Sequence, residues 1–537
     1  MSSVPVNPII PGFSPDPSIV LVDGTFYLVT STFHLFPGLP IYVSKDLVSW
    51  THIGNAINRR TQLSLKNSST KFFPPDSRGD VMLSTGGLYA PTVRHHAGTF
   101  YIVCTNVIHT THPDTKDRPE NFILTTTDIH ANNWSDPIPF DFRGIDPSIF
   151  FNDDGDGDGR AYIQASASPG PMTTITQFEI NPATGEKLSA EKILWTGTGD
   201  IYPEGPHLYK KDGWYYLMIS EGGTFDGHMV TVARSRDLWG PYESYEHNPI
   251  LTARDTEEYI QATGHCDVFQ DLRGRWWGVC LGTRKREGRY VLGRETFLTT
   301  AEWKEGDWPV LDQVRLDPNP NDGSLLARKE DLRTEPGVDY LYIRDPELDH
   351  YSFSDDDNGT ITLTASAADI SQWQDPTTFI GKRQRKHDGI AKVTLHNPQP
   401  TPAATTTTTT LKAGLAYYKD EHRHIKLFHD FSTSEIVLEL TNNAKSISRT
   451  VRHGLGQQEM TTNDAVTFRV EYTEVEYRFS FSMGGDEDED VARSWVVVGC
   501  VDALEMTGPD FVGPVIGVFA TAREEGVRAK FEGLGVE

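Results

Sequence analysis

Three acidic residues stand at matching positions in the first part of the chain, each directly before an apolar run. They are Asp16 in FSPDPSIV, Asp146 in GIDPSIFF and Glu204 in IYPEGPHLY. One such motif is explained as easily by a turn as by a functional acid. Three motifs at matching positions favour a shared site, because burying an acid is costly unless it is used or paired. Hydrolysis of a glycosidic bond needs one protonated acid and one carboxylate, and a third acid would raise the proton affinity of the first.

These acids are expected on a repeated element, which is a turn glycine followed by aromatic residues and an apolar run. Its five copies begin at DGTFYLV, AGTFYIV, DGRAYIQ, DGWYYLM and RGRWWGV, with glycines spaced by 74, 61, 54 and 61 residues. Each copy predicts a β-hairpin, because the glycine supplies the turn and the residues after it favour a pleated, half-buried surface. Units of about 50 to 70 residues with four strands are typical of propeller blades, so the first part is predicted to be a five-bladed β-propeller.

The residues just before each turn glycine should form the innermost strand of a blade, which lines the central channel. At that phase the fifth unit has His265 and Asp267 in TGHCDVF, and the second unit has YAPTVRHH. The three acids, although distant in sequence, are therefore predicted to converge on one axis.

The repeat stops at about residue 325, where a segment rich in Pro, Asp and Gly indicates a linker. From about residue 338 onward, short alternating runs such as GTITLTAS, IAKVTLHN, EIVLEL and AVTFRVEYT predict an antiparallel β-sandwich. We therefore predict an all-β chain with a catalytic propeller over residues 1–325 and a β-sandwich over residues 326–537. The Thr405 to Thr410 run and the acidic segment 485–492 are interpreted as exposed loops.

Composition excludes several classes of function. The chain has 75 acidic and 49 basic residues, a net charge of -26 and no clustered basic stripe, so a nucleic acid partner is not expected. No window approaches the ~18 apolar residues of a membrane span, and the start lacks a basic stretch followed by an apolar one. A cytoplasmic location is therefore expected, and secretion by another route stays open. Four cysteines form neither a CxxC pair nor a recognisable disulfide framework.

At these motifs the chain resembles glycoside hydrolase family 43, and within it the long two-domain β-xylosidases and α-L-arabinofuranosidases. The likeness covers nearly the whole chain. It includes NPIIPGFSPDPSI, GGLYAPTVR, GIDPSIFF, YPEGPHLYKKDGWYYL, GHCDVFQD and LGRETFL, and, in the sandwich, FIGKRQ and AGLAYYKDE. The resemblance implies a five-bladed propeller followed by a concanavalin A-like jelly roll.

The resemblance also implies roles for individual residues. Asp16 would be the general base that activates water, Glu204 the general acid, and Asp146 the residue that orients Glu204 and raises its pKa. The implied sugar-binding residues are Arg294, which would hydrogen-bond the sugar, Phe33 and Tyr89 as pocket walls, and Phe511, which would close one side of the site from the sandwich.

Two positions depart from the family pattern. Tyr89 stands where the xylosidase pattern has Trp, which leaves the choice between xylose and arabinose open. After Phe511 the chain reads Val512-Gly513-Pro514 instead of Thr-Gly-Ala, which puts the role of Phe511 in doubt.

No cofactor or metal is required by the expected reaction. His265 is interpreted either as a ligand of a central ion or as a neutral hydrogen-bonding residue under the site, and it is counted among the substrate-binding residues. Asp154, Asp156 and Asp158 match the front of an EF-hand loop, but its twelfth position is Ala165 where a glutamate is needed. A structural calcium is therefore possible but not indicated, and an acidic β-turn is the simpler interpretation.

Together these features predict an exo-acting, inverting glycoside hydrolase that releases terminal pentoses from xylo-oligosaccharides or arabinoxylan fragments, as a β-1,4-xylosidase, an α-L-arabinofuranosidase or both. Asp16 and Glu204 would then lie roughly 6.5 to 9.5 Å apart, which leaves room for a water molecule. The alternatives are a carbohydrate-binding propeller without catalysis and a propeller of the fructosidase or levansucrase type. The sequence leaves the oligomeric state open, including a homo-oligomer.

Overall fold

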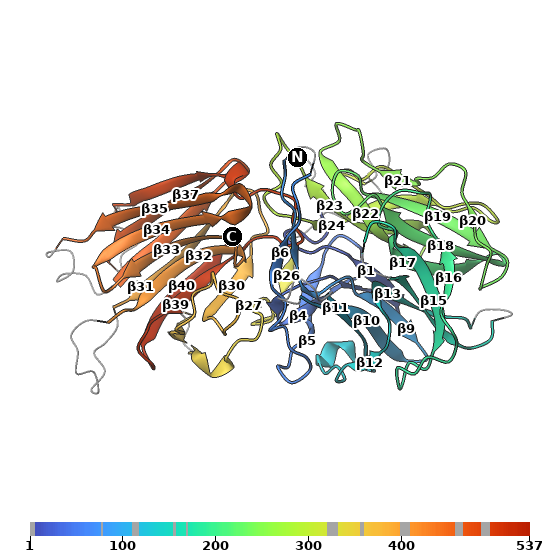
Figure 1. Ribbon diagram of the computed structural model, residues 1–537, viewed down its shortest axis with the longest axis horizontal. Coiled ribbons are helices and arrows are strands. Elements are labelled where there is room, and N and C mark those ends of the chain that lie inside the picture. The colour runs from blue at the N-terminus through green and yellow to red at the C-terminus, as the bar shows by residue number, and fades with distance from the viewer. Residues whose placement is uncertain are drawn as a thin grey trace. The chain divides into compact units, whose positions relative to one another are not determined.

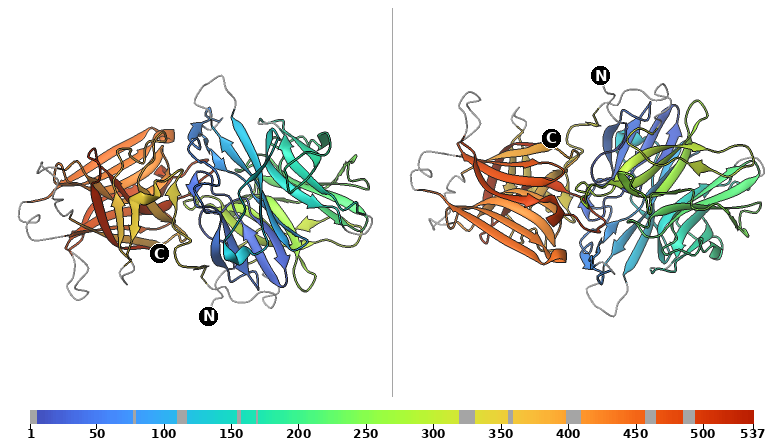
Figure 2. Two further views of the ribbon diagram at one scale, coloured as in Figure 1. Left: turned by 90° about the horizontal axis from the view of Figure 1, so that it is seen from below. Right: turned by 90° about the horizontal axis from the view of Figure 1, so that it is seen from above.

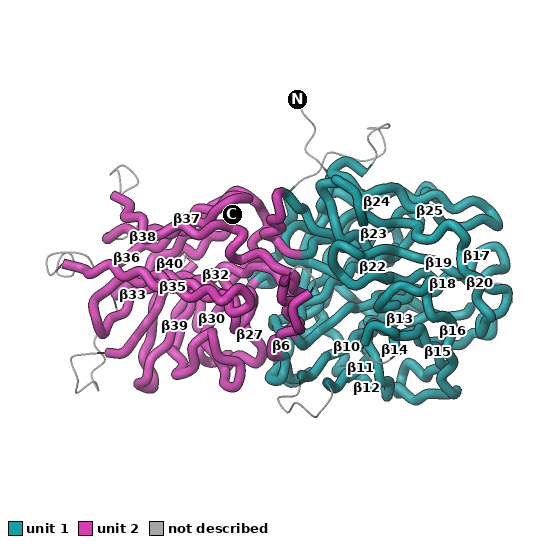
Figure 3. The backbone as a smooth tube through the Cα atoms, turned by 45° about the horizontal axis from the view of Figure 1, so that its top comes forward, with its two compact units in different colours: residues 1–68, 86–286, 294–339 teal, residues 69–85, 287–293, 340–537 magenta. Residues whose placement is uncertain are grey.

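The structure is a computed structural model, and the regular secondary structure of its described residues consists almost entirely of β-strands (Figure 1). It describes residues 6–76, 79–109, 117–153, 157–167, 170–318, 331–354, 359–397, 409–456, 465–484 and 494–537. Asp154, Asp156, most of the expected linker, residues 405–408 and the acidic segment 485–492 lie outside these ranges. The chain divides into two compact units (Figure 3), of which the first comprises Met1–Ser68, Gly86–Arg286 and Arg294–Asp339.

The first unit contains five antiparallel sheets in chain order, which are the blades of the predicted propeller (Figures 1 and 2). Blade 1 has β1 (Ser18–Val22), β2 (Thr25–Val29), β4 (Gly38–Ser44) and β5 (Thr51–Ile57). Blade 2 has β8 (Gly87–Leu88), β9 (Thr92–His96), β10 (Thr99–Ile108), β11 (Arg118–Thr126) and β12 (Ile138–Phe140). Blade 3 has β13 (Gly144–Phe151), β14 (Ala161–Ala167), β15 (Thr174–Ile180) and β16 (Lys192–Trp195).

The last two blades follow the same order. Blade 4 has β17 (Glu204–Lys211), β18 (Trp214–Glu221), β19 (Met229–Ser235), β20 (Glu243–Ser244) and β21 (Leu251–Thr252). Blade 5 has β22 (Ile260–Gln270), β23 (Trp276–Arg284), β24 (Glu295–Glu302) and β25 (Val310–Leu311). Outside these five sets, the unit has β3 (Leu35–Phe36), β26 (Arg333–Thr334), which pairs in parallel with β5, and a 3-10 turn at Ile129–Ala131.

The predicted repeat is confirmed, because each turn glycine lies between the inner strand of a blade and the strand that follows it. All five have a φ of +70 to +79°, where residues with a Cβ are strained, and they are Gly24, Gly98, Gly159, Gly213 and Gly274. The inner strands β1, β9, β13, β17 and β22 contact one another in a closed ring. The residues before each turn glycine therefore form the innermost strands, as the position of the repeat predicted.

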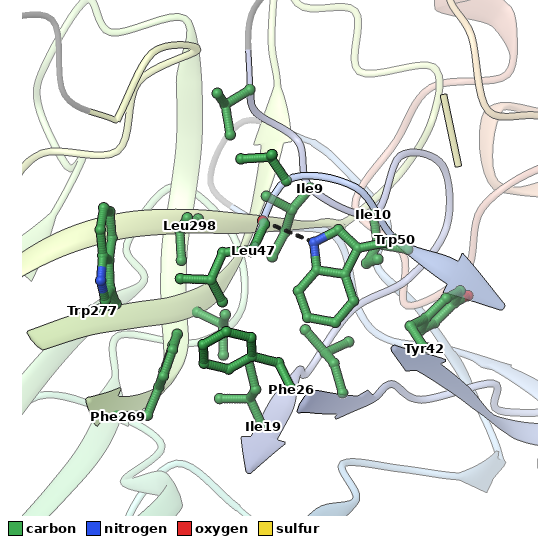
Figure 4. Packing of buried hydrophobic residues seen from close by; sticks show 14 residues of the cluster. Ile9, Ile10, Ile19, Phe26, Tyr42, Leu47, Trp50, Phe269, Trp277 and Leu298 are labelled. Atoms are coloured by element: carbon green, nitrogen blue, oxygen red, sulfur yellow. Dashed lines mark hydrogen bonds between the residues drawn. The ribbon is translucent and has the colours of Figure 1, made fainter. Parts of the chain in front are cut away.

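The ring is closed between the first and last blades by the N-terminal segment. Asn7 donates from its amide to the Leu298 carbonyl and accepts from the Leu298 backbone N–H, at 2.7 and 2.8 Å. Ile10 forms a bridge with Thr296 of β24. Around this seam, large side chains of both blades form one core, in which Trp50 donates to the Leu47 carbonyl at 2.9 Å (Figure 4). Burial of this apolar surface holds the ring closed.

The Asp-rich turn of blade 3 is described in part. The Asp158 carboxylate accepts hydrogen bonds from Asn152 Nδ2 at 3.0 Å, from the Tyr162 hydroxyl at 2.5 Å and from the Arg160 backbone N–H at 3.3 Å. These bonds close the turn between β13 and β14. Asp158 thus has the structural role of a turn residue.

The second unit comprises Ser69–Thr85, Glu287–Gly293 and Tyr340–Glu537, and its main part is two large antiparallel sheets. One sheet has seven strands, ordered β28 (Tyr351–Phe353), β29 (Ile361–Thr364), β40 (Arg528–Val536), β31 (Gly389–His396), β36 (Ala465–Tyr472), β37 (Glu476–Met483) and β38 (Val496–Asp502). The other has six, ordered β30 (Phe379–Arg383), β39 (Val515–Thr521), β32 (Lys412–Asp420), β33 (Arg423–Asp430), β34 (Glu435–Asn442) and β35 (Ile447–Gly454). The predicted β-sandwich is therefore confirmed.

Shorter elements complete the second unit. They are β6 (Thr70–Phe72), β7 (Leu83–Thr85), β27 (Tyr342–Ile343) and 3-10 turns at Leu348–His350, Asn443–Lys445 and Ala503–Glu505. Two segments before residue 325 are tied to it, because Thr70 donates its backbone N–H to Glu421 at 2.7 Å and Arg289 pairs with Asp502 at 3.0 Å. No helix in the described part of the chain is long and apolar enough to cross a membrane.

Candidate active site

The three predicted acids lie at the starts of inner strands, where the backbone departs from regular strand geometry. Asp16 lies two residues before β1, Asp146 is in β13, and Glu204 begins β17. Asp16 and Asp146 have φ values of 56° and 55°, and the strand register shifts next to both Asp146 and Glu204. Such β-bulges turn a side chain away from the direction that simple alternation gives. They aim these acids at a common site.

Asp16 is held as a carboxylate. Its Oδ1 accepts from Arg294 Nη1 at 3.1 Å and its Oδ2 accepts from the Ser31 hydroxyl at 2.6 Å, while only 5% of the residue is exposed. Burial alone would raise the pKa of Asp16, but the positive charge of Arg294, with smaller contributions from His265 and Ser31, outweighs it. The pKa of Asp16 therefore lies below its usual value, and Asp16 is ionised near neutral pH.

Asp146 supports the segment that carries Glu204. Its Oδ2 accepts the backbone N–H of Gly205 at 3.1 Å, which fixes the residue next to Glu204. Burial raises the pKa of Asp146 to about 6, and the negative charge of Asp16 adds to the rise. Asp146 thus both orients the Glu204 backbone and places a titrating charge beside it.

Glu204 is the most accessible of the three acids, with 20% of its side chain exposed. Burial raises the pKa of Glu204 well above its usual value, and the carboxylates of Asp146 and Asp16 raise it further. Glu204 is therefore protonated at a pH where Asp16 is ionised. A site with one ionised and one protonated carboxyl group provides both the base and the acid of a hydrolysis.

Arg294 lies between Asp16 and an aromatic wall. Its Nη1 also donates to the Thr224 hydroxyl at 2.9 Å, and its guanidinium lies 5.4 Å from the centre of the Phe33 ring. Phe33 contacts Tyr89, with ring centres 4.9 Å apart, since the Phe33 backbone pairs with Leu88. The structure thus brings together Arg294, Phe33 and Tyr89, three of the five predicted substrate-binding residues.

His265 also belongs to this group. It has a φ of 47° at a register shift of β22, its backbone N–H donates to the Ser220 hydroxyl at 2.6 Å, and its ring lies against Gly205. In the described residues, no group of three or more His, Cys, Asp or Glu side chains is arranged to hold a metal ion.

Phe511, the fifth predicted residue, belongs to the second unit, where it is half-buried and lies in sequence between Asp510 and β39. Its role at the site stays a prediction.

The channel also holds a charged cluster that joins all five blades. Arg94 of β9 forms two hydrogen bonds to Asp267 of β22, at 2.8 and 3.1 Å. Asp267 also accepts from the hydroxyls of Ser18 in β1 and Tyr209 in β17, each at 2.7 Å. The pKa of Asp267 lies below its usual value, because Arg94 outweighs the effect of burial. The cluster therefore links the inner strands through hydrogen bonds between their side chains.

The remaining blade joins this cluster through a histidine. The Nδ1 of His207 lies 3.1 Å from Arg94 Nη2 and 3.2 Å from the hydroxyl of Ser148 in β13. Asp267 was expected on the channel from its place in TGHCDVF, whereas its partner Arg94, in YAPTVRHH, was not predicted. The phase of the repeat could have found Arg94, because it precedes a turn glycine as the acids do.

Three further residues of the site were missed. The Ser31 hydroxyl donates to Asp16, and the Thr224 hydroxyl accepts from Arg294. His228 places its Nε2 3.8 Å from Glu204 Oε1. Ser31 follows β2, and the other two lie in the loop between β18 and β19, outside the repeated phase. Nothing in the sequence pattern distinguishes them from ordinary loop residues.

Comparison with known families agrees with this arrangement. A model described as glycosyl hydrolases family 43 matches residues 5–309, and one described as the β-xylosidase C-terminal concanavalin A-like domain matches residues 333–537. The chain belongs to glycosyl hydrolase family 43. The predicted membership and the glycosidase class are therefore confirmed.

Individual family 43 proteins are similar over most of the chain. A non-reducing end α-L-arabinofuranosidase of Bacteroides ovatus is 38% identical, over 70% of this chain and 68% of its own length. A xylosidase/arabinosidase of Butyrivibrio fibrisolvens is 34% identical, over 78% and 79%. The crystal structure of a xylan β-1,4-xylosidase from Bacillus halodurans superimposes with a TM-score of 0.81 at 26% identity, covering 98% of both chains.

Proposed function

We propose that this family 43 protein is an exo-acting, inverting glycosidase that removes terminal pentose units, xylose or arabinose, from xylo-oligosaccharides or arabinoxylan fragments. One observation carries the proposal: the pKa of Asp16 lies below its usual value, whereas that of Glu204 in the same site lies well above. The acid and base roles follow from this difference. The substrate class follows from the names of the relatives.

In the proposed mechanism, the Asp16 carboxylate takes a proton from a water molecule while the water oxygen bonds to the anomeric carbon. The bond from that carbon to the leaving oxygen breaks, its electron pair stays on the oxygen, and Glu204 supplies the proton. Asp16 ends protonated and Glu204 ionised, and proton exchange with solvent restores both. Because water attacks from the face opposite the leaving group, the anomeric centre is inverted.

The test is hydrolysis of 4-nitrophenyl β-D-xyloside and 4-nitrophenyl α-L-arabinofuranoside, with the first product anomer followed by NMR. We expect release of the sugar with inverted configuration, and a loss of kcat by orders of magnitude in Asp16→Ala and Glu204→Ala. Retained configuration, or full activity in either variant, would contradict the mechanism. Sugar binding without hydrolysis would indicate the carbohydrate-binding alternative, and hydrolysis of sucrose the fructosidase alternative.

A further inference from the structure

His228 is a buried histidine that the roles assigned above do not use. It directly precedes β19, and its side chain has no exposed surface. Its backbone N–H donates to the Phe225 carbonyl at 2.8 Å, and its own carbonyl accepts from the Thr252 hydroxyl at 3.0 Å. The backbone of His228 is therefore fixed on both sides.

The hydrogen bond of the ring decides which ring nitrogen carries the proton. Nδ1 lies 3.2 Å from the backbone carbonyl oxygen of Ala262. A carbonyl oxygen only accepts, so Nδ1 must carry the hydrogen, and in the neutral ring Nε2 then presents a lone pair. Burial favours this neutral form, because it lowers the pKa of His228 to about 3.

The lone pair of Nε2 faces the acid. Nε2 lies 3.8 Å from Glu204 Oε1, and it has no hydrogen-bond partner among the described residues. Room for the ring is made by Gly264, where an added Cβ would lie 2.3 to 2.5 Å from three ring atoms. A distance of 3.8 Å exceeds that of a hydrogen bond, but the terminal torsion of a glutamate is broad, so rotation of the carboxyl group can close it.

We propose that His228 is a positioning residue for the general acid: its Nε2 accepts a hydrogen bond from the protonated carboxyl group of Glu204 and disfavours the ionised form of Glu204. An acceptor at this place favours the protonated form, because two lone pairs face each other once the proton has left. His228 thus holds the proton on Glu204 until the leaving oxygen arrives. This role rests on the proposed function of Glu204 as the acid.

Other charged groups act on the same carboxyl group and must stay unchanged in a test. Those facing Glu204 and His228 from the neighbouring strands are Asp16, Asp146, His265 and Arg294. The test must therefore alter the acceptor alone.

The experiment compares the pH dependence of kcat/KM for the wild type, His228→Leu and a control, His247→Leu, which removes an exposed histidine. Loss of the acceptor should move the alkaline limb of His228→Leu down by about half to one pH unit. The acid limb, set by Asp16, should stay in place. The control should keep both limbs.

A second measurement serves if His228→Leu does not fold. Nitrogen-15 NMR of the wild-type imidazoles should show one buried ring with a protonated Nδ1 and an unprotonated Nε2 up to at least neutral pH. Gly264→Ala, which pushes the ring from its place while leaving His228 present, should move the alkaline limb in the same direction.

The outcomes separate the two proposals. A wild type that releases no sugar would overturn the proposed function and this role with it. A wild type with a bell-shaped profile, together with a His228→Leu variant of lower kcat/KM but an unmoved alkaline limb, would overturn only the role of His228. So would an Nε2 that carries the hydrogen.

Discussion

Replacing Arg294 with methionine should raise the pKa of Asp16 and move the acid limb of kcat/KM to higher pH. Arg294 Nη1 lies 3.1 Å from Asp16 Oδ1, and both side chains are buried, so solvent screens the pair weakly. A hydrogen bond to a charged group contributes about 1.5 to 3 kcal/mol, and one pKa unit corresponds to about 1.4 kcal/mol. The acid limb should therefore move up by about one to two pH units.

The direction follows from the state in which Asp16 acts. Asp16 is a base only when ionised, and Arg294 holds its pKa below the usual value, so without Arg294 a higher pH is needed for ionisation. Arg294 also lowers the pKa of Glu204 to a smaller extent, so the alkaline limb should move up as well, but less. The whole profile should shift toward higher pH and become narrower.

The assay is kcat/KM as a function of pH on a 4-nitrophenyl glycoside that the wild type hydrolyses. Ser31→Ala removes the 2.6 Å hydrogen bond to Asp16 and should move the acid limb in the same direction. Arg160→Met, at an exposed turn, removes an arginine without touching the site and should change neither limb. If Arg294→Met lowers kcat/KM with an unmoved acid limb, Arg294 does not control the charge of Asp16.

Three further perturbations test other parts of the structure. Asp146→Asn should lower the pKa of Glu204 and move the alkaline limb down by roughly one unit, because a like charge is removed; an unmoved limb would contradict this role. Glu204→Ala should impair hydrolysis of xylobiose far more than that of a dinitrophenyl glycoside, whose leaving group needs no proton; equal losses would exclude Glu204 as the acid. Arg94→Met should lower the free energy of unfolding by about 3 kcal/mol, since Asp267 is left buried without its charged partner. Unfolding in urea measures this loss, and a much smaller loss would contradict the structural role of the pair.

Much of the fold follows from local patterns. A glycine with positive φ between two strands leaves a mark in the sequence, because few other residues tolerate that backbone, and all five such glycines occupy their predicted turns. Alternating runs likewise predicted sandwich strands such as β31 and β36. The starts of Ser69–Thr85 and Glu287–Gly293 carry no such mark, and only contacts distant in sequence assign both segments to the second unit.

For the candidate site, too, some features could be predicted from the sequence and others depended on the tertiary structure. The sequence by itself indicated which acids belong to the channel, because Asp16, Asp146 and Glu204 each stand next to the apolar run of an inner strand, ahead of a turn glycine. Only the tertiary structure decided their chemistry. Ionisation depends on the groups that the fold brings near, such as Arg294 beside Asp16 and His228 beside Glu204, and these come from loops and bulges without a period. The free energy of a buried charge is set by its neighbours in space, and a sequence orders its neighbours only along the chain.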